Sequence, residues 1–143
     1  MKDIRLQIPC RADYIDIVRV CLYSIASKLS FTYEEIEDMK VAVSEACNNA
    51  VLHGSPELAD NSIDIRFQPS DTSLTIKVTN KGPAFPHDEA LVKAAPLQEG
   101  SIRDLPVGGL GIFLMQALMD EVAVETKDQT TVVTLMKTKK QTE

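Results

Sequence analysis

The sequence lacks the features that mark membrane and secreted proteins. No apolar run in its 143 residues approaches the roughly 18 needed to cross a bilayer, and no charged segment followed by an apolar one opens the chain. Its three cysteines, Cys10, Cys21 and Cys47, are odd in number and show no CxxC spacing, which favours buried, reduced thiols over disulfides. We therefore expect a cytoplasmic protein without membrane association.

Positive charge is also in short supply. The chain has 15 Lys and Arg residues against 21 Asp and Glu residues, and the net charge of −6 repels phosphate backbones and anionic membranes. Direct nucleic-acid binding is therefore not expected. Hydrophobic residues at 44% and charged residues at 25% are ordinary for a globular protein, and the length suits one domain over residues 1–143.

Hydrophobic periodicity predicts strands and helices in separate groups. The expected order is a strand, two helices, a hairpin, a long connection, a helix and a hairpin. This grouping indicates an α+β two-layer sandwich, with helices on one face of a mixed, mostly antiparallel sheet. The connection over about residues 83–108 is long for a compact domain, which favours a functional lid or a disordered segment. The expected elements are a strand ending at Pro9, helices over 12–29, 33–53 and 109–119, and hairpins over 63–78 and 122–135. Thr32 and Glu35 form a capping-box pattern that opens the second helix, and Ile63, Ile65 and Phe67 alternate with polar residues as in a strand.

Glu45, Asn49 and His53 are spaced at i, i+4 and i+8 within the run VSEACNNAVLHG of the second predicted helix. Successive members drift by only about 40° around a helix, so the three side chains share one stripe among apolar neighbours. One interpretation is a solvated helix edge, with His53 favoured by the helix dipole beside a glycine C-cap. In the other, the Asn49 oxygen binds Mg²⁺ and Glu45 accepts a proton from a nucleophile.

A predicted strand runs into a glycine turn in VTNKGPAF, residues 78–85. As an isolated pattern, a strand followed by Asn-Lys-Gly is typical of an ordinary turn. Its functional interpretation is a base pocket, in which the Asn80 oxygen accepts a hydrogen bond from an adenine 6-amino group. Gly82 would then let the backbone approach the ring closely.

Glycines precede the last predicted helix, in VGGLGIFLMQALMDEV, residues 107–122. The free N–H groups and positive dipole end of such a helix can hold a phosphate. A flexible hinge for the preceding connection explains the same glycines equally well. The pattern is neither a Walker motif nor a Rossmann GxGxxG after a strand, which excludes those two nucleotide-binding folds.

Taken in order, these features resemble the N box and the two glycine boxes of the GHKL ATPase superfamily. Within it, FTYEEIEDMKVAVSEACNNAVLHG and GGLGIFLMQALMDEV are similar to motifs of the anti-sigma factor serine kinases of the RsbW and SpoIIAB type. The resemblance covers nearly the whole chain. It implies a Bergerat-type sandwich that binds ATP with Mg²⁺. It also implies a homodimer that sequesters an alternative sigma factor and phosphorylates a serine on an anti-anti-sigma (STAS-type) partner.

The resemblance also implies roles for individual residues. Glu45 would be the catalytic base, Asn49 the Mg²⁺ ligand, and His53 a structural or supporting residue at the end of the N box. Arg103 would meet the γ-phosphate from the lid, and a threonine of the last hairpin would help to hold adenine through a water. The expected ATP-binding set is Asn49, His53, Asn80, Gly82, Ala84, Phe85, Arg103, Gly108, Gly109, Leu110, Gly111, Ile112, Thr130 and Thr131.

One position departs from the family pattern, since Asn80 stands where the family has Asp. An amide accepts a hydrogen bond without the charge assistance of a carboxylate, and its NH₂ group faces a different partner, so nucleotide affinity or preference is expected to differ. A non-catalytic, nucleotide-binding module that sequesters a sigma factor is therefore an alternative function. A histidine-kinase-like ATPase domain is a third. Arg19, away from the apolar stripe of the first helix, is the candidate contact to a partner protein, although an ordinary solvated charge fits equally well.

Overall fold

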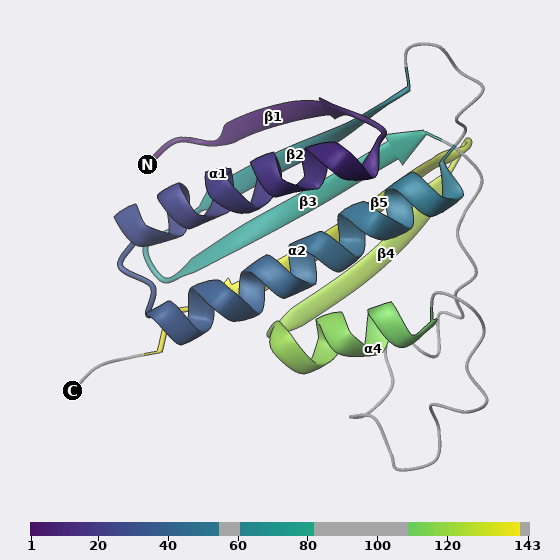
Figure 1. Ribbon diagram of the computed structural model, residues 1–143. Helices are drawn as coiled ribbons and strands as arrows, with labels where there is room; N and C mark the ends of the chain where they lie inside the picture. The colour runs from purple at the N-terminus through teal and green to yellow at the C-terminus, as the bar shows by residue number, and fades with distance from the viewer. Residues whose placement is uncertain (55–60, 82–108, 141–143) are drawn as a thin grey trace.

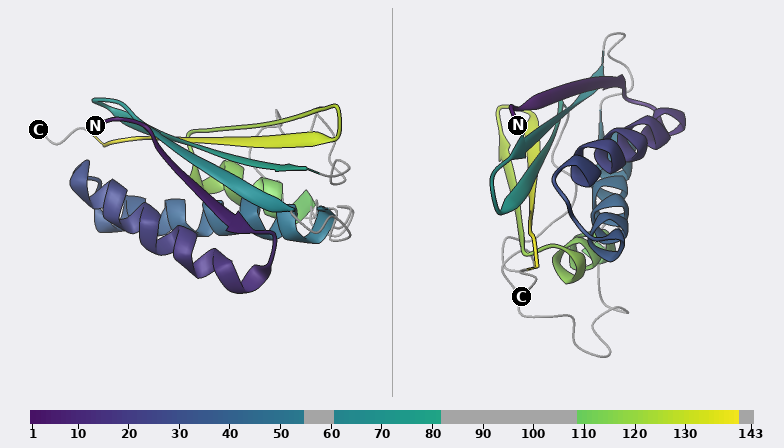
Figure 2. Two further views of the ribbon diagram at one scale, coloured as in Figure 1. Left: turned by 90° about the horizontal axis from the view of Figure 1, so that it is seen from above. Right: turned by 90° about the vertical axis from the view of Figure 1, so that its left-hand side faces the viewer.

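The computed structural model describes residues 1–54, 61–81 and 109–140. Within these ranges the chain forms two layers, a five-stranded sheet and a layer of helices that covers one of its faces (Figures 1 and 2). No helix in these ranges is both long and apolar enough to cross a bilayer. The elements are β1 (Ile4–Pro9), η1 (Ala12–Tyr14), α1 (Ile15–Lys28), α2 (Tyr33–His53), β2 (Ser62–Pro69), β3 (Ser73–Lys81), α4 (Gly109–Leu118), β4 (Glu121–Lys127) and β5 (Thr130–Thr138).

The sheet has the strand order β1-β2-β3-β5-β4, and every neighbouring pair is antiparallel. The α+β two-layer prediction is confirmed, but the parallel pair expected of a mixed sheet is not found among the described strands. The reason is the position of β5. The strands β3 and β4 run in the same direction, yet β5 lies between them and takes the backbone hydrogen bonds of both.

The core lies between the two layers, at the apolar positions of the predicted patterns. On β2, Ile63, Ile65 and Phe67 alternate with half-buried polar residues and point toward the helices. The buried side chains of α1, Val18 and Leu22 among them, recur at helical spacing and face the sheet layer. Burying one such side chain stabilises a fold by about 1.5–3 kcal/mol. The opposite face of the sheet carries no helix in the described ranges and can be polar.

The N-terminal end of α2 is fixed by the predicted capping box. Thr32 Oγ1 accepts a hydrogen bond from the Glu35 N–H at 3.1 Å, and Glu35 Oε1 accepts one from the Thr32 N–H at 2.8 Å. Glu35 Oε2 also accepts from the Lys140 N–H at 2.8 Å, beyond the end of β5. Burial alone would raise the pKa of Glu35, but these hydrogen bonds and the Lys140 charge hold the pKa below its ordinary value.

A second contact sets the direction of α2 against the sheet. Lys137 Nζ, on β5, donates to Asp38 Oδ2 at 3.4 Å and to the Leu118 carbonyl at the end of α4. The early residues of α2 thus lie beside the last residues of β5, so helix and strand run antiparallel. The C-terminal turns of α2 therefore reach the end of the molecule where β5 begins and β3 ends (Figure 1).

Candidate functional site

The polar stripe of α2 meets the glycine-rich start of α4. A Cβ atom built on Gly111 would lie 3.0 Å from Glu45 Oε2 and 3.5 Å from Asn49 Nδ2. A side chain at position 111 would therefore press on the Glu45 carboxylate. The structure brings together two motifs that are far apart in the sequence, and the close approach depends on glycine at this point.

Asn49 is buried, at 5% exposure, and its amide nitrogen has no hydrogen-bond partner in the described part of the chain. A buried polar group without a partner costs about 1–3 kcal/mol. Glu35, by contrast, is also buried and both of its carboxylate oxygens accept backbone hydrogen bonds. Asn49 therefore offers an unused amide, next to a half-buried carboxylate, where a polar ligand would be stabilised.

His53 ends α2 at a crowded joint with β1. Its side chain is half-buried, and burial lowers the pKa of the imidazole, which is therefore neutral at pH 7. One turn earlier, the Ala50 carbonyl accepts a hydrogen bond from Cys10 Sγ at 3.6 Å, and a Cβ atom built on Gly54 would lie 2.6 Å from the same oxygen. This packing fixes the C-terminal end of α2, where His53 stands.

Asn80 and Thr131 are neighbours at the same end of the sheet. They are register partners on β3 and β5, and both are buried on the helix-covered face, at 5% and 1% exposure. Thr131 Oγ1 lies 3.2 Å from Thr126 Oγ1 on β4. Thr130 is half-buried and, by strand alternation, points to the opposite face. Of the two candidate threonines, only Thr131 shares a face with Asn80.

Comparison with known proteins agrees with this arrangement. The family described as the histidine kinase-like ATPase domain matches residues 8–137. The serine-protein kinase RsbW of Bacillus subtilis (strain 168) is 38% identical over 130 residues, a match that covers 90% of this chain and 81% of that protein. The chain belongs to the RsbW family of serine-protein kinases. The RsbW proteins of Listeria innocua, 34% identical over 131 residues, and of Halalkalibacterium halodurans, 37% identical over 135 residues, match 91% and 93% of the chain and 83% and 80% of their own lengths.

A solved structure shares the fold of this RsbW-family chain. It contains the RsbU and RsbW domains of a Mycobacterium tuberculosis protein and matches with a TM-score of 0.70 at 17% sequence identity. The match covers 99% of this chain and 34% of that one. Together with the family match over residues 8–137, this structure confirms the predicted two-layer sandwich of the GHKL type.

The start of α4 belongs to the nucleotide site predicted for this RsbW relative. In the first turn of α4, which is described, the backbone N–H groups have no carbonyl partner within the helix. Ile112 can contribute only its backbone there, because its side chain is buried in the core at 0% exposure.

Other residues predicted for the nucleotide site lie outside the described ranges. They are Gly82, Ala84, Phe85, Arg103 and Gly108, together with the predicted lid.

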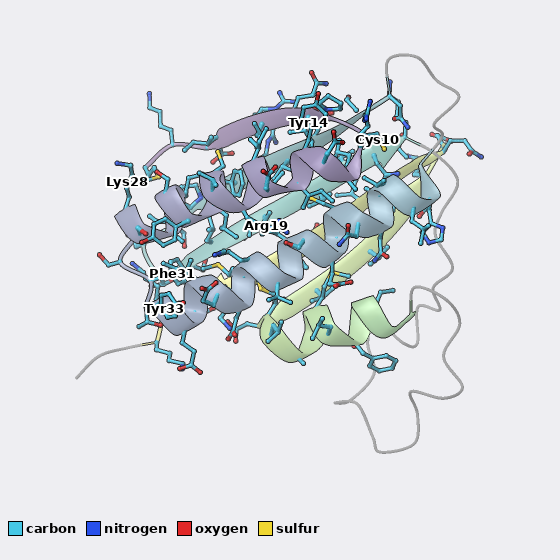
Figure 3. All side chains as sticks on the ribbon, viewed as in Figure 1. Cys10, Tyr14, Arg19, Lys28, Phe31 and Tyr33 are labelled. Atoms are coloured by element: carbon cyan, nitrogen blue, oxygen red, sulfur yellow. The ribbon has the colours of Figure 1, made fainter. Side chains whose placement is uncertain are left out.

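Arg19 is less exposed than the sequence suggests. Its side chain is half-buried between α1 and α2 (Figure 3), where Nη1 donates to Ser44 Oγ at 3.1 Å. Ser44 in turn donates to the Lys40 carbonyl at 2.7 Å. Sequence reasoning missed Ser44, because a serine in mid-helix gives no local signal of a partner on another helix.

A metal ion at this site would depend on few protein ligands. No group of three or more His, Cys, Asp or Glu side chains within the described ranges is placed to hold one. Mg²⁺ beside a nucleotide usually takes one or two protein ligands and completes its shell with waters and phosphate oxygens. The Asn49 side-chain oxygen, beside the space kept by Gly111, could supply one such ligand, while the unpartnered Asn49 nitrogen is a donor that suits a phosphate oxygen.

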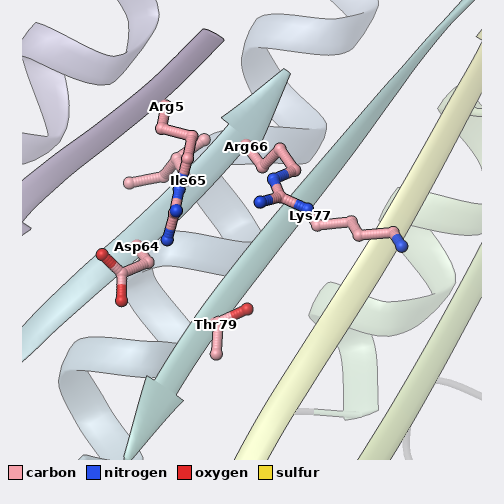
Figure 4. Close-up of a pocket in the computed structure, with 6 residues that line it drawn as sticks. All are labelled: Arg5, Asp64, Ile65, Arg66, Lys77 and Thr79. Carbon is pink, nitrogen blue, oxygen red and sulfur yellow. The ribbon is translucent and has the colours of Figure 1, made fainter. Parts of the chain in front are cut away.

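The uncovered face of the sheet carries a cavity of about 240 Å³. Arg5, Arg66 and Lys77 occupy one row across β1, β2 and β3, beside Asp64 (Figure 4). No carboxylate in the described ranges lies within 4 Å of these three cations. The sequence places each at a polar position of a strand, but the row itself depends on strand register, which the local pattern does not give.

Proposed function

We propose that this chain is an ATP-dependent protein serine kinase that also sequesters an alternative sigma factor in the cytoplasm. Its protein substrate would be a serine on an anti-anti-sigma (STAS-type) partner. The observation that carries the proposal is the buried, unpartnered amide of Asn49, beside the Glu45 carboxylate and the space kept by Gly111. The similar proteins named serine-protein kinase RsbW support it. Residues 1–143 would form one kinase domain, with its lid over about 83–108.

In the proposed reaction, Glu45 accepts the proton of the incoming serine hydroxyl. The serine oxygen bonds to the γ-phosphorus of ATP, the bond from that phosphorus to the β–γ bridging oxygen breaks, and ADP leaves. The free N–H groups of residues 109–112, at the positive end of α4, hold phosphate oxygens. Phosphoryl transfer demands mainly positioning and charge neutralisation, so a few polar groups suffice.

The remaining residues bind the nucleotide. Asn49 would hold Mg²⁺ through its side-chain oxygen, while its nitrogen donates to a phosphate oxygen. When bound, the ion neutralises charge on the phosphate oxygens. Asn80 and Thr131 would hold the base at the end of the sheet, with Gly82, Ala84 and Phe85 beside them. Arg103 would contact the γ-phosphate.

Arg19 is our proposed contact to a protein partner. Ser44 holds its guanidinium in place, and Tyr23, four residues further along α1 and so on the same side of the helix, is 52% exposed. An arginine held beside an exposed aromatic side chain has the composition of an interface hot spot. The side of α1 that faces α2 would therefore contact the partner.

The homodimer is proposed to form through the uncovered face of the sheet. The cationic row of Arg5, Arg66 and Lys77 is unfavourable within one copy, since like charges opposite each other destabilise a sheet. Glu121 and Glu125, on β4, are exposed at the other edge of the same face. A two-fold axis parallel to the strands would set the basic half of one copy against the acidic edge of the other.

The proposal is tested with labelled ATP and a purified STAS-type protein. We expect label on a serine of that protein. Glu45→Gln should lower transfer by about 10²–10⁴-fold, while calorimetry still detects Mg·ATP binding. The matched control is Glu34→Gln, an exposed carboxylate in the first turn of the same helix, which should transfer at the parental rate.

Other results would favour the alternatives. A parental rate in Glu45→Gln would refute the base assignment. Binding of ATP and of a sigma factor without labelling of any partner would indicate a non-catalytic sequestering module. That alternative is considered because Asn80 stands where the family has Asp. Label held by this chain itself, in an acid-labile and base-stable form, would indicate a histidine-kinase-like domain.

A further inference from the structure

Asn80 is a polar side chain buried at the end of the sheet, in a position that suits a base more than a turn. Its register partners are Ile63 on β2 and Thr131 on β5, which are 0% and 1% exposed. All three side chains point to the helix-covered face, as the buried alternate positions of β3 show. The neighbouring strands β2 and β5 therefore flank the Asn80 side chain on both sides.

Thr131 and Asn80 differ in their hydrogen bonding. The Thr131 hydroxyl has a partner, Thr126, at 3.2 Å. In the described part of the chain, no hydrogen bond engages the Asn80 side chain. An amide without a partner at the end of the sheet, on a residue that is 5% exposed, is available to a ligand.

We propose that Asn80 lets this site accept 6-oxo purine nucleotides as well as ATP. The inference rests on the proposed function, in which this end of the sheet holds the base. A carboxylate at position 80 could only accept hydrogen bonds, so it would pair with a 6-amino group and repel a 6-oxo group. An amide carries both an acceptor and a donor.

The two orientations of the amide serve the two bases. In one, the Asn80 oxygen accepts from the 6-amino group of adenine. After a half-turn of the terminal torsion, which is broad and roughly two-fold, the nitrogen donates to a 6-oxo group. A site rejects an analogue by about 10⁴–10⁵-fold only when binding it leaves buried polar groups unpaired. Each purine pairs with one group of the Asn80 amide, so Asn80 should not discriminate strongly between adenine and a 6-oxo purine.

Inosine triphosphate is the sharpest probe, because it carries the 6-oxo group without the 2-amino group of guanine. Calorimetry on the nucleotide-stripped full chain would compare Mg·ATP with Mg·ITP. We expect dissociation constants within about tenfold of each other. Asn80→Asp should then weaken ITP relative to ATP by a further factor of about 10–100, since the carboxylate has no donor for the 6-oxo group.

The matched control is Thr79→Val, because Thr79 is the adjacent residue of β3 and faces the uncovered side of the sheet. It should leave the ratio of the two dissociation constants unchanged. A wild-type chain that binds ATP but binds ITP more than about 100-fold more weakly would overturn the inference. An unchanged ratio in Asn80→Asp would overturn it as well.

Failure of the inference and failure of the proposed function give different results. If neither nucleotide binds the wild-type chain, the proposed nucleotide site itself is wrong. If ATP binds and ITP does not, only the role of Asn80 is wrong. The wild-type ratio decides the question even if Asn80→Asp does not fold, which circular dichroism would reveal.

Discussion

Gly111 lies so close to Glu45 that a Cβ atom on the glycine would stand 3.0 Å from the carboxylate oxygen Oε2. The two residues belong to α4 and α2, and they join at the point where Asn49 has an unused amide. The contact gives a steric reason for the third glycine of the GGLG run, Gly111. Any side chain there would occupy room that the carboxylate needs.

Gly111→Ala should separate activity from stability. Alanine is favoured over glycine in a helix by about 1 kcal/mol, so thermal unfolding should occur at the same temperature or higher. Transfer to the STAS-type partner should fall by about 10–100-fold, because small displacements of catalytic groups are costly. Parallel melting curves and phosphotransfer rates measure the two effects. A parental rate of transfer would show that the space at position 111 is not needed.

Gly54→Ala provides the contrast. Its Cβ atom would meet the Ala50 backbone oxygen at 2.6 Å and Cys10 Sγ at 3.0 Å. Backbone yields less easily than the end of a side chain, so we expect a loss of about 1–3 kcal/mol in the free energy of unfolding. Urea denaturation would show that loss, and none for Gly111→Ala.

Arg66→Glu should weaken the proposed homodimer. The new carboxylate would relieve the repulsion among Arg5, Arg66 and Lys77 within one copy and oppose the acidic edge of the other. We expect the dimer dissociation constant to rise by about 10–100-fold in sedimentation experiments, since like charges across an interface are costly. Lys28→Glu makes the same charge change at an exposed position of α1 and should leave the dimer dissociation constant unchanged. An unchanged dimer in Arg66→Glu would exclude this face.

Local patterns were sufficient to predict most of the fold. The alternation of Ile63, Ile65 and Phe67 predicted a half-buried strand, and Thr32 with Glu35 predicted the start of α2; both are confirmed. What failed was the expectation of a mixed sheet, because β5 lies between β3 and β4 and every neighbouring pair of described strands is antiparallel. Strand order depends on how the last hairpin inserts into the sheet, and no residue pattern within either strand encodes that.

The candidate site was predictable only in part, for a similar reason. The stripe of Glu45 and Asn49 follows from helical spacing. That Thr131 and not Thr130 lies beside Asn80 follows from the register of β5 on β3, which alternation alone leaves undecided. The Ser44 contact of Arg19 needs the packing of two helices. Each missed feature joins residues distant in sequence, where side-chain pairing is set by the assembled fold.

Cys47 should be the least reactive of the cysteines. Burial raises its thiol pKa to about 12, while the charge of Arg19 acts in the opposite direction. Its side chain is 0% exposed, whereas Cys10 and Cys21 are half-buried. At pH 8 we expect iodoacetamide to modify Cys47 far more slowly than the other two, because the thiolate is the reactive form. Peptide mass mapping measures this, and equal rates in strong denaturant are the control.

Glu35 should make the stability of the fold depend on pH below neutrality. Its pKa is lower in the folded than in the unfolded chain, so the native state binds fewer protons and gains stability as pH rises. The contribution is fully present above the unfolded value of about 4.3 and is lost as pH falls through the folded pKa. Glu35→Gln removes the charge, and its NH₂ group cannot accept from the Lys140 N–H. We therefore expect a loss of about 1–3 kcal/mol at pH 7 that shrinks toward pH 3.

Urea denaturation of both proteins at pH 7, 5, 4 and 3 would measure the difference. Glu34→Gln is the matched control, since Glu34 is exposed and in the same first turn of α2. It should change the free energy of unfolding by about 0.5 kcal/mol or less at every pH. If the loss of unfolding free energy in Glu35→Gln stayed constant from pH 7 to pH 3, the hydrogen bonds from the Thr32 and Lys140 N–H groups would not depend on an ionised carboxylate. In that case the joint between α2 and the end of β5 would depend on side-chain shape instead of charge.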